Sequence, residues 1–200
     1  MSSPSVLIGD PGILIWIPAF AGMTTRGVMT NDIKVLFSAD QIQTRVVEIA
    51  KQIERDIPDD GEFVVVGVLK GSFIFMADLV RHIEKPLACD FLRVASYDKD
   101  RSTGIVRMEF DLTQPIEGKH VILVEDIVDT GTTLKHLLVH MKQKRPASLK
   151  IASLLFKDVG TGMRDHIDYL GFEVPDKFVI GYGLDYEGHY RALPYVGVKG

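Results

Sequence analysis

The chain has 200 residues, of which 46% are hydrophobic and 25% are charged, and its formal net charge is -4. This balance predicts a globular domain and argues against a broad nucleic-acid-binding surface, which would need an excess of basic residues. The single cysteine, Cys89, excludes an internal disulfide and a thiolate metal cluster, and it fits the reducing cytoplasm in which we expect the protein. The chain lacks an uninterrupted apolar run near the roughly 20 residues that cross a bilayer.

The first 28 residues differ in composition from the rest of the chain. They hold one acidic and one basic residue and an apolar run that Pro18 interrupts. A secretory signal peptide is one interpretation, because residues 19–21 resemble a cleavage site, but the segment before them carries an acid and has no Lys or Arg. We therefore expect residues 1–28 to be a disordered tail or a wrongly assigned start. Met29 is then the natural start, and residues 29–200 form one domain.

Regular secondary structure is predicted from Ser38 onward. Ser38 and Gln41 form a capping box that begins a helix, and apolar residues with helical spacing follow it: Ile42, Val46, Ile49 and Ile53. The β-branched run 63–69 is typical of a strand buried on both faces of a parallel sheet. Strands that alternate with helices predict an α/β fold with a doubly wound sheet. The other expected helices are 72–83 and 132–145, and the other strands are 88–96, 121–124, 149–156 and 178–182.

The most informative segment is 121–134, which reads VILVEDIVDTGTTL. An apolar strand ends in Glu125 and Asp126, and a loop of small residues then leads into a helix. Ligands of open parallel sheets bind beyond the carboxyl ends of the strands, so these groups should meet at one site. Amides at the helix start suit a phosphate, and carboxylates suit sugar hydroxyls or a metal ion, so a phosphorylated sugar satisfies both. The alternative is an ordinary capped helix, with the acids on an exposed turn and Asp129 as the cap.

The sequence resembles a known family at several places. Four apolar residues, two acids, two apolar residues and then Asp-Thr-Gly-Thr-Thr at 129–133 resemble the phosphoribosyl-diphosphate motif of the type I phosphoribosyltransferases. The segments 69–72, 96–104 and 177–186 resemble the 6-oxopurine branch of that family, the hypoxanthine-guanine phosphoribosyltransferases of bacterial type. The resemblance covers residues 38–198. It implies a mainly parallel sheet with a small hood and a mobile flap.

The activity that this resemblance implies belongs to purine salvage. The phosphoribosyl group of 5-phosphoribosyl 1-diphosphate would pass to N9 of the purine, giving IMP or GMP and pyrophosphate. Hypoxanthine is the first expected base, guanine the second and xanthine the third. Asp129 would accept the N7 proton as N9 attacks C1 of the sugar. Glu125 and Asp126 would hold the ribose hydroxyls or a metal bound to them, and the 5′-phosphate would lie among four loop residues: Thr130, Gly131, Thr132 and Thr133.

The resemblance also implies the rest of the site. Lys70, Gly71 and Arg191 would bind pyrophosphate. The peptide bond between Leu69 and Lys70 would be cis. The implied cofactor is Mg²⁺, a hard cation that takes carboxylate oxygens, held by Asp185 with Glu125 and Asp126. The purine would contact Lys157, Lys177, Phe178 and Val179.

Two roles in the implied site concern selectivity and water. A lysine beside the purine O6 would select a 6-oxo base over a 6-amino base, and the sequence leaves open whether Lys157 or Lys177 does so. Ser96 and Tyr97 would belong to a flap whose closure excludes water from the cationic sugar.

Two other functions stay open. The first is an RNA-binding regulator of the same fold, which would need a basic face. The second is a transferase for another base (xanthine, adenine or a pyrimidine), and residues 177–185 speak against adenine and pyrimidines. A Rossmann oxidoreductase and a P-loop ATPase are disfavoured, because the sequence lacks both the three-glycine fingerprint and the Walker A lysine. The expected partners are small-molecule substrates and further copies of the chain, as a dimer or tetramer, without nucleic acid or membrane.

Overall fold

A computed structural model of the chain describes residues 33–96 and 106–199. The expected domain start at Met29 and the flap residue Tyr97 lie outside these ranges. The described helices are α1 (Ala39–Asp56), α2 (Phe73–Val80), α3 (Thr132–Gln143) and the short 3-10 helix η1 (Met163–His166). None of the helices in the described part of the chain is long and apolar enough to span a membrane.

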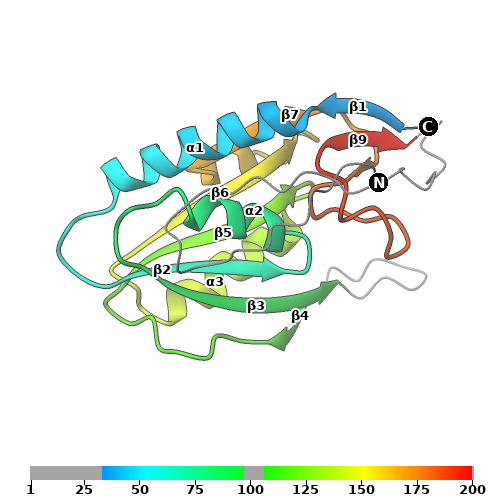
Figure 1. The fold of residues 1–200 in the computed structure, drawn as a ribbon. Helices are drawn as coiled ribbons and strands as arrows, with labels where there is room; N and C mark the ends of the chain where they lie inside the picture. The colour runs from blue at the N-terminus through cyan, green and yellow to red at the C-terminus, as the bar shows by residue number, and fades with distance from the viewer. Residues whose placement is uncertain (1–32, 97–105, 200) are drawn as a thin grey trace, which may run out of the picture. The chain divides into compact units, whose positions relative to one another are not determined.

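A six-stranded sheet forms the centre of the fold (Figure 1). Every pair of neighbouring strands is parallel except β3 and β4, which are antiparallel. The expectation of a mainly parallel sheet is therefore confirmed. The strands in spatial order are β4 (Val106–Phe110), β3 (Ala88–Ser96), β2 (Phe63–Leu69), β5 (His120–Val128), β6 (Ser148–Lys157) and β7 (Tyr169–Val174).

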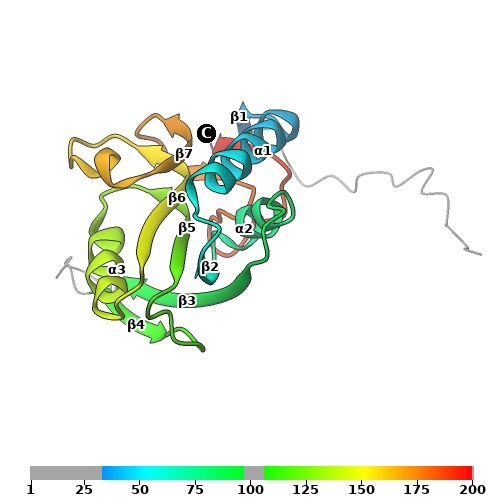
Figure 2. The ribbon, with the colours of Figure 1, turned by 90° about the vertical axis from the view of Figure 1, so that its left-hand side faces the viewer.

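Helices cover both faces of this sheet. Figure 2 shows α1 and α2 on one side of the strands and α3 on the other. The Ser38 capping box is present, with both of its reciprocal hydrogen bonds, and the four apolar residues predicted on the inner face of α1 are fully buried. Burial of each such side chain contributes roughly 1.5–3 kcal/mol, so this face docks α1 on the sheet. A second apolar cluster lies under α3 and includes Leu134, Leu137 and Met141.

Strand β5 is longer than predicted. The sequence places its end at Val124, whereas the strand continues to Val128 because its backbone keeps pairing with β6, Ile127 opposite Leu155 and Val128 opposite Phe156. Glu125 and Asp126 therefore lie within the strand and not after it. Helix α2 is shorter than predicted, since it ends at Val80 and not at residue 83.

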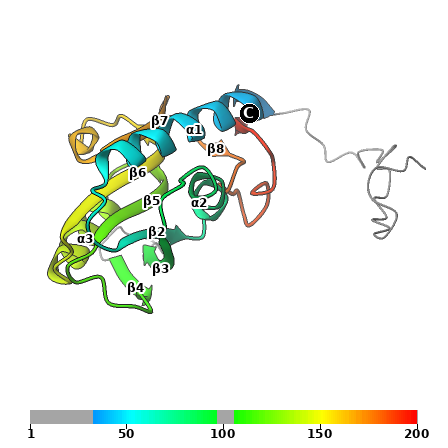
Figure 3. The same cartoon turned by 60° about the vertical axis from the view of Figure 1, so that its left-hand side comes forward.

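A second sheet was not predicted as such. β1 (Ile33–Phe37), β9 (Val196–Lys199) and β8 (Val179–Ile180) form three antiparallel strands in the order β1-β9-β8. The strand expected at 178–182 is reduced to the two residues of β8 and belongs to this sheet, which we call the hood. Figures 1 and 3 show the chain that follows β8 beside α2.

Candidate active site

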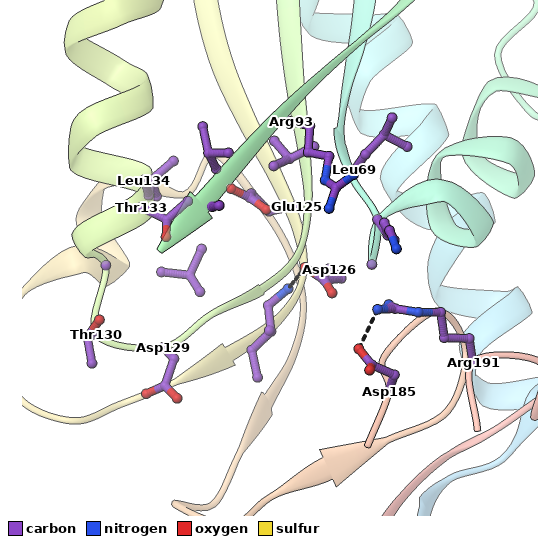
Figure 4. Close-up of a pocket in the computed structure, with 18 residues that line it drawn as sticks. Leu69, Arg93, Glu125, Asp126, Asp129, Thr130, Thr133, Leu134, Asp185 and Arg191 are labelled. Atoms are coloured by element: carbon purple, nitrogen blue, oxygen red, sulfur yellow. Dashed lines mark hydrogen bonds and ion pairs between the residues drawn. The ribbon is translucent and has the colours of Figure 1, made fainter. Parts of the chain in front are cut away.

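A cavity of about 580 Å³ opens at the carboxyl ends of β2 and β5, where the sequence predicts the site (Figure 4). Residues from four places line it: the end of β2 with Lys70 and Gly71, the end of β3, β5 with the loop into α3, and Asp185 with Arg191. Ten of the predicted site residues line the cavity: Lys70, Gly71, Glu125, Asp126, Asp129, Thr130, Gly131, Thr133, Asp185 and Arg191. Far-separated segments thus converge on one cavity.

The loop into α3 has the geometry of a phosphate cradle. Gly131 is the N-cap residue of α3, with a φ of 74° in the left-handed region, and the cap has no side-chain hydrogen bond. The first amides of the helix are therefore free to bind an anion, which the helix dipole also favours. The alternative that Asp129 caps this helix is wrong. A Cβ on Gly131 would lie 2.1 Å from Met163 Cγ, so the close packing beneath the loop requires glycine.

The two carboxylates of β5 are destabilised as anions in the free protein. Burial raises the pKa of Glu125 well above its ordinary value, and the neighbouring charge of Asp126 raises it further. Burial also raises the pKa of Asp126, to about 6, although the Ile127 amide, 3.0 Å from Asp126 Oδ1, and the charge of Arg191 oppose this shift. Groups that donate hydrogen bonds or carry positive charge would stabilise both anions. Sugar hydroxyls and a cation are such groups.

The segment after β2 packs tightly on this acidic strand. The peptide bond between Leu69 and Lys70 is cis, as the resemblance implies. A Cβ on Gly71 would lie 1.5 Å from Asp126 Oδ2, so only glycine fits there. On the other side of the cavity Arg191 forms an ion pair with Asp185 and donates from Nη1 to the Gly183 carbonyl oxygen at 2.5 Å. Figure 4 shows this pair facing Asp126 across the cavity.

The predicted purine residues lie beyond the lining of this cavity. Lys157, 9% exposed at the end of β6, places Nζ 2.9 Å from Asp129 Oδ2 and 3.6 Å from Asp176 Oδ1. Phe178 is 56% exposed and meets Tyr186 edge-on, with ring centroids 5.5 Å apart, while Val179 is buried in β8. Apart from the flap residues Ser96 and Tyr97, the predicted site residues absent from the cavity lining are Thr132, Lys157, Lys177, Phe178 and Val179.

Arg93 lines the cavity and was not predicted. It lies near the end of β3, and its Nε is 2.9 Å from Glu109 Oε2 of β4. The available signal was a charged residue near the end of a predicted strand, which is uncommon without a partner. Ser96, predicted for the flap, is the last residue of β3, and it pairs with Val106 of β4.

The three carboxylates named as magnesium ligands do not form a self-sufficient metal site. Within residues 33–96 and 106–199, no three His, Cys, Asp or Glu side chains converge closely enough to hold a metal ion. Asp126 and Asp185 nevertheless lie near enough for the charge of Asp185 to raise the pKa of Asp126. Mg²⁺ is often bound through one or two carboxylates, with phosphate and water oxygens as the remaining ligands. The residues present fit that kind of site.

The family model of the phosphoribosyl transferase domain matches residues 37–187, a range that contains the whole central sheet and the loop into α3. A hypoxanthine-guanine phosphoribosyltransferase of Streptococcus pneumoniae is 45% identical over 173 residues, which cover 86% of this chain and 96% of that protein. The Dictyostelium discoideum protein of the same name is 45% identical over 168 residues, 82% of this chain and 93% of that one.

Solved structures give the same result. The crystal structure of a hypoxanthine-guanine phosphoribosyltransferase from Bacillus anthracis, with a HEPES molecule in its active site, matches with a TM-score of 0.79 and 42% identity. The match covers 84% of this chain and 99% of that one. The chain therefore belongs to the phosphoribosyltransferases, in their hypoxanthine-guanine branch.

Proposed function

We propose that this chain salvages purines by transferring the phosphoribosyl group of 5-phosphoribosyl 1-diphosphate to N9 of hypoxanthine and, second, of guanine. The products are IMP or GMP and pyrophosphate. One observation carries the proposal: three kinds of group line the same cavity. They are the uncapped start of α3 at Gly131, the carboxylates Glu125 and Asp126, and the two cationic side chains Lys70 and Arg191. A phosphate, a pentose and a diphosphate each find a matching group there.

The roles of the residues follow from where charge develops. The bond between C1 and the diphosphate oxygen breaks with its electron pair on the diphosphate, while the N9–C1 bond forms. Lys70 and Arg191 stabilise the departing charge, and the amides of the loop 130–133 hold the 5′-phosphate. The purine gains positive charge as N9 attacks, N7 becomes acidic, and Asp129 accepts its proton.

The base is recognised at the far side of Asp129. Lys157 offers its ammonium to the purine O6, since it is already beside the carboxylate that would face N7. The solvent-exposed face of the Phe178 ring stacks on the purine, and the backbone of Val179 contacts the edge of the purine ring. Lys177 is exposed, and we assign it the lesser role.

Mg²⁺ is the proposed cofactor. Asp185 and the carboxylates of β5 would hold it together with oxygens of the diphosphate and ribose. When bound, it supplies positive charge that offsets the charge of the diphosphate.

We also propose that Ser96 and Tyr97 belong to a closing flap and that the protein is cytoplasmic. We propose further that it forms a dimer or tetramer, which light scattering would measure.

A panel of bases tests the function. The full chain is incubated with Mg²⁺, 5-phosphoribosyl 1-diphosphate and, separately, hypoxanthine, guanine, xanthine and adenine, and nucleotide formation is followed by absorbance and chromatography. We expect IMP to form fastest and AMP to be absent. Nucleotide formation from adenine alone would identify a transferase for another base. A failure with every base, together with salt-sensitive RNA binding, would support the regulator instead.

A further inference from the structure

The segment that follows β8 contains a strained residue with no part in the site described above. Tyr182 has a φ of 48°, in the left-handed region, and it lies between Gly181 and Gly183, whose φ values are 96° and 103°. A bulky side chain in this region is unusual, and it persists where the surrounding structure over-determines it. The Tyr182 side chain is 3% exposed and packs in the apolar cluster shared with α1 and α2.

The hydroxyl of Tyr182 links this segment to α2 by a hydrogen bond. It donates to Asp78 Oδ2 at 2.6 Å, and the same oxygen accepts from Gln43 Nε2 at 2.9 Å. Arg81 forms an ion pair with the other oxygen of Asp78. Burial alone would raise the pKa of Asp78, but these hydrogen bonds outweigh it and lower the pKa. The acceptor is thus a carboxylate, and hydrogen bonds to ionised groups are stronger than neutral ones.

The two ends of this hydrogen bond lie on the two segments that carry the proposed diphosphate-binding residues. Asp78 lies on α2, which begins two residues after Gly71. Tyr182 directly precedes Gly183, whose backbone packs on the Gly71 peptide, because a Cβ on Gly183 would lie 2.1 Å from the Gly71 carbonyl oxygen. The Gly183 amide donates to the Arg191 carbonyl oxygen at 2.9 Å, and Arg191 Nη1 donates back to Gly183.

We propose that Tyr182 and Asp78 are positioning residues. Their hydrogen bond sets the distance between two parts of the site: the segment of Lys70 and Gly71, and the ion pair of Asp185 and Arg191. The inference rests on the proposed function, in which these groups bind the diphosphate. The 5′-phosphate cradle and Lys157 lie on the other elements β5, α3 and β6, so the bond should affect the diphosphate and leave the base alone.

The test is the variant Tyr182→Phe, which removes one oxygen and keeps the ring that fills the core. Small misplacements of binding groups reduce rates by up to about 10²-fold. We expect the KM for 5-phosphoribosyl 1-diphosphate to rise by about 10-fold and the Kd of pyrophosphate to rise in parallel. The KM for hypoxanthine should change by less than about 2-fold. Asp78→Asn, which keeps an acceptor but removes its charge, should act in the same direction and more weakly.

Tyr169→Phe is the matched control. Tyr169 is 2% exposed in the same apolar cluster, and its hydroxyl likewise donates to a carboxylate, Asp56 Oδ2, at 2.9 Å. It lies on β7, outside the cavity lining. Both variants should lower Tm to a similar extent, whereas only Tyr182→Phe should change the diphosphate constants.

The outcomes separate this inference from the proposed function. A wild-type chain that forms no nucleotide would refute the function itself. An active wild-type chain, with Tyr182→Phe and Tyr169→Phe alike in every kinetic constant, would overturn the positioning role alone. Equal increases in the KM values for base and diphosphate would also overturn it, because the effect would then be a general loosening of the fold.

Discussion

Lys157 Nζ and Asp129 Oδ2 lie 2.9 Å apart, so the cation proposed for the purine O6 and the base proposed for N7 are paired before any purine arrives. The Asp129 side chain is 45% exposed and that of Lys157 only 11%, so the carboxylate reaches the cavity while the ammonium remains behind it. A 6-oxopurine presents an acceptor at O6 beside N7. It can therefore engage both partners of the pair without leaving either charge unpaired.

Asp129→Asn should separate binding from chemistry. The amide keeps the shape of the side chain but cannot take the N7 proton, and loss of a general base typically reduces rate by about 10²–10⁴-fold. We expect kcat to fall within that range while the KM for 5-phosphoribosyl 1-diphosphate changes little, measured by steady-state kinetics.

Asp176→Asn is the control for this substitution. Asp176 Oδ1 also faces Lys157, at 3.6 Å, but its side chain is 78% exposed and lies outside the cavity lining. Exposed ion pairs contribute little, so kcat should stay within about 2-fold of the wild type. Equal losses in the two variants would show that Asp129 acts only by holding Lys157.

The two lysines should differ sharply in base selection. Both lie outside the cavity lining, but Lys157 is buried beside Asp129 whereas Lys177 is exposed. We expect Lys157→Met to reduce kcat/KM for hypoxanthine by about 10²-fold, because a buried polar contact to O6 is lost. Lys177→Met should stay within about 3-fold. If Lys177→Met is instead the variant that begins to use adenine, our assignment of the two lysines is reversed.

Gly131→Ala should weaken phosphate binding as well as stability. Its φ is +74° and a Cβ would meet Met163, so the loop must shift. We expect the KM for 5-phosphoribosyl 1-diphosphate to rise by at least about 10-fold and the free energy of unfolding to fall by about 2 kcal/mol.

Gly160→Ala separates backbone strain from the loop's contacts. Gly160 has nearly the same φ, +73°, but a Cβ there would have nothing within 4 Å. The variant should lose only the strain part of the stability, about 1 kcal/mol, and keep the wild-type KM. A rise of KM in Gly160→Ala equal to that in Gly131→Ala would contradict a specific role for the cradle.

Asp126→Asn should stabilise the free protein at neutral pH. The folded-state pKa of Asp126 is raised to about 6, so the fold favours the protonated acid, and stability is lost as pH rises from about 4 through 6. An amide cannot ionise, and its oxygen can still accept from the Ile127 amide. At pH 7.5 without divalent cations, the variant should gain about 3 kcal/mol in the free energy of unfolding, and at pH 4 most of the gain should be gone.

The same substitution should abolish substrate-dependent stabilisation. Mg²⁺ with 5-phosphoribosyl 1-diphosphate should raise Tm in the wild type, and this rise should be largely lost in Asp126→Asn. Thermal denaturation with and without the substrate measures both effects. A variant less stable than the wild type at pH 7.5 would show that Asp126 carries a structural charge instead.

Structural features that depend on neighbouring residues were predicted correctly from the sequence. The Ser38 capping box, the apolar face of α1 and the strand β2 each depend on residues that are close in sequence, and all three are confirmed. The end of β5 was misplaced because its pairing with β6 overrides the polarity of Glu125 and Asp126. The hood was implied only by the resemblance, and its strands 33–37 and 196–199 were not predicted, because they are short and their pairing is marked by no local pattern.

The sequence by itself determined the make-up of the candidate site: the order of strand, acids, small-residue loop and helix places helix amides beside carboxylates, since all of them lie within 14 consecutive residues. Tertiary structure decided what those residues meet. Gly71 against Asp126, Arg93 at the cavity wall, and Tyr182 bound to Asp78 each join segments brought together only by sheet pairing and helix packing. Such contacts depend on burial and distance in three dimensions, which a linear pattern does not record.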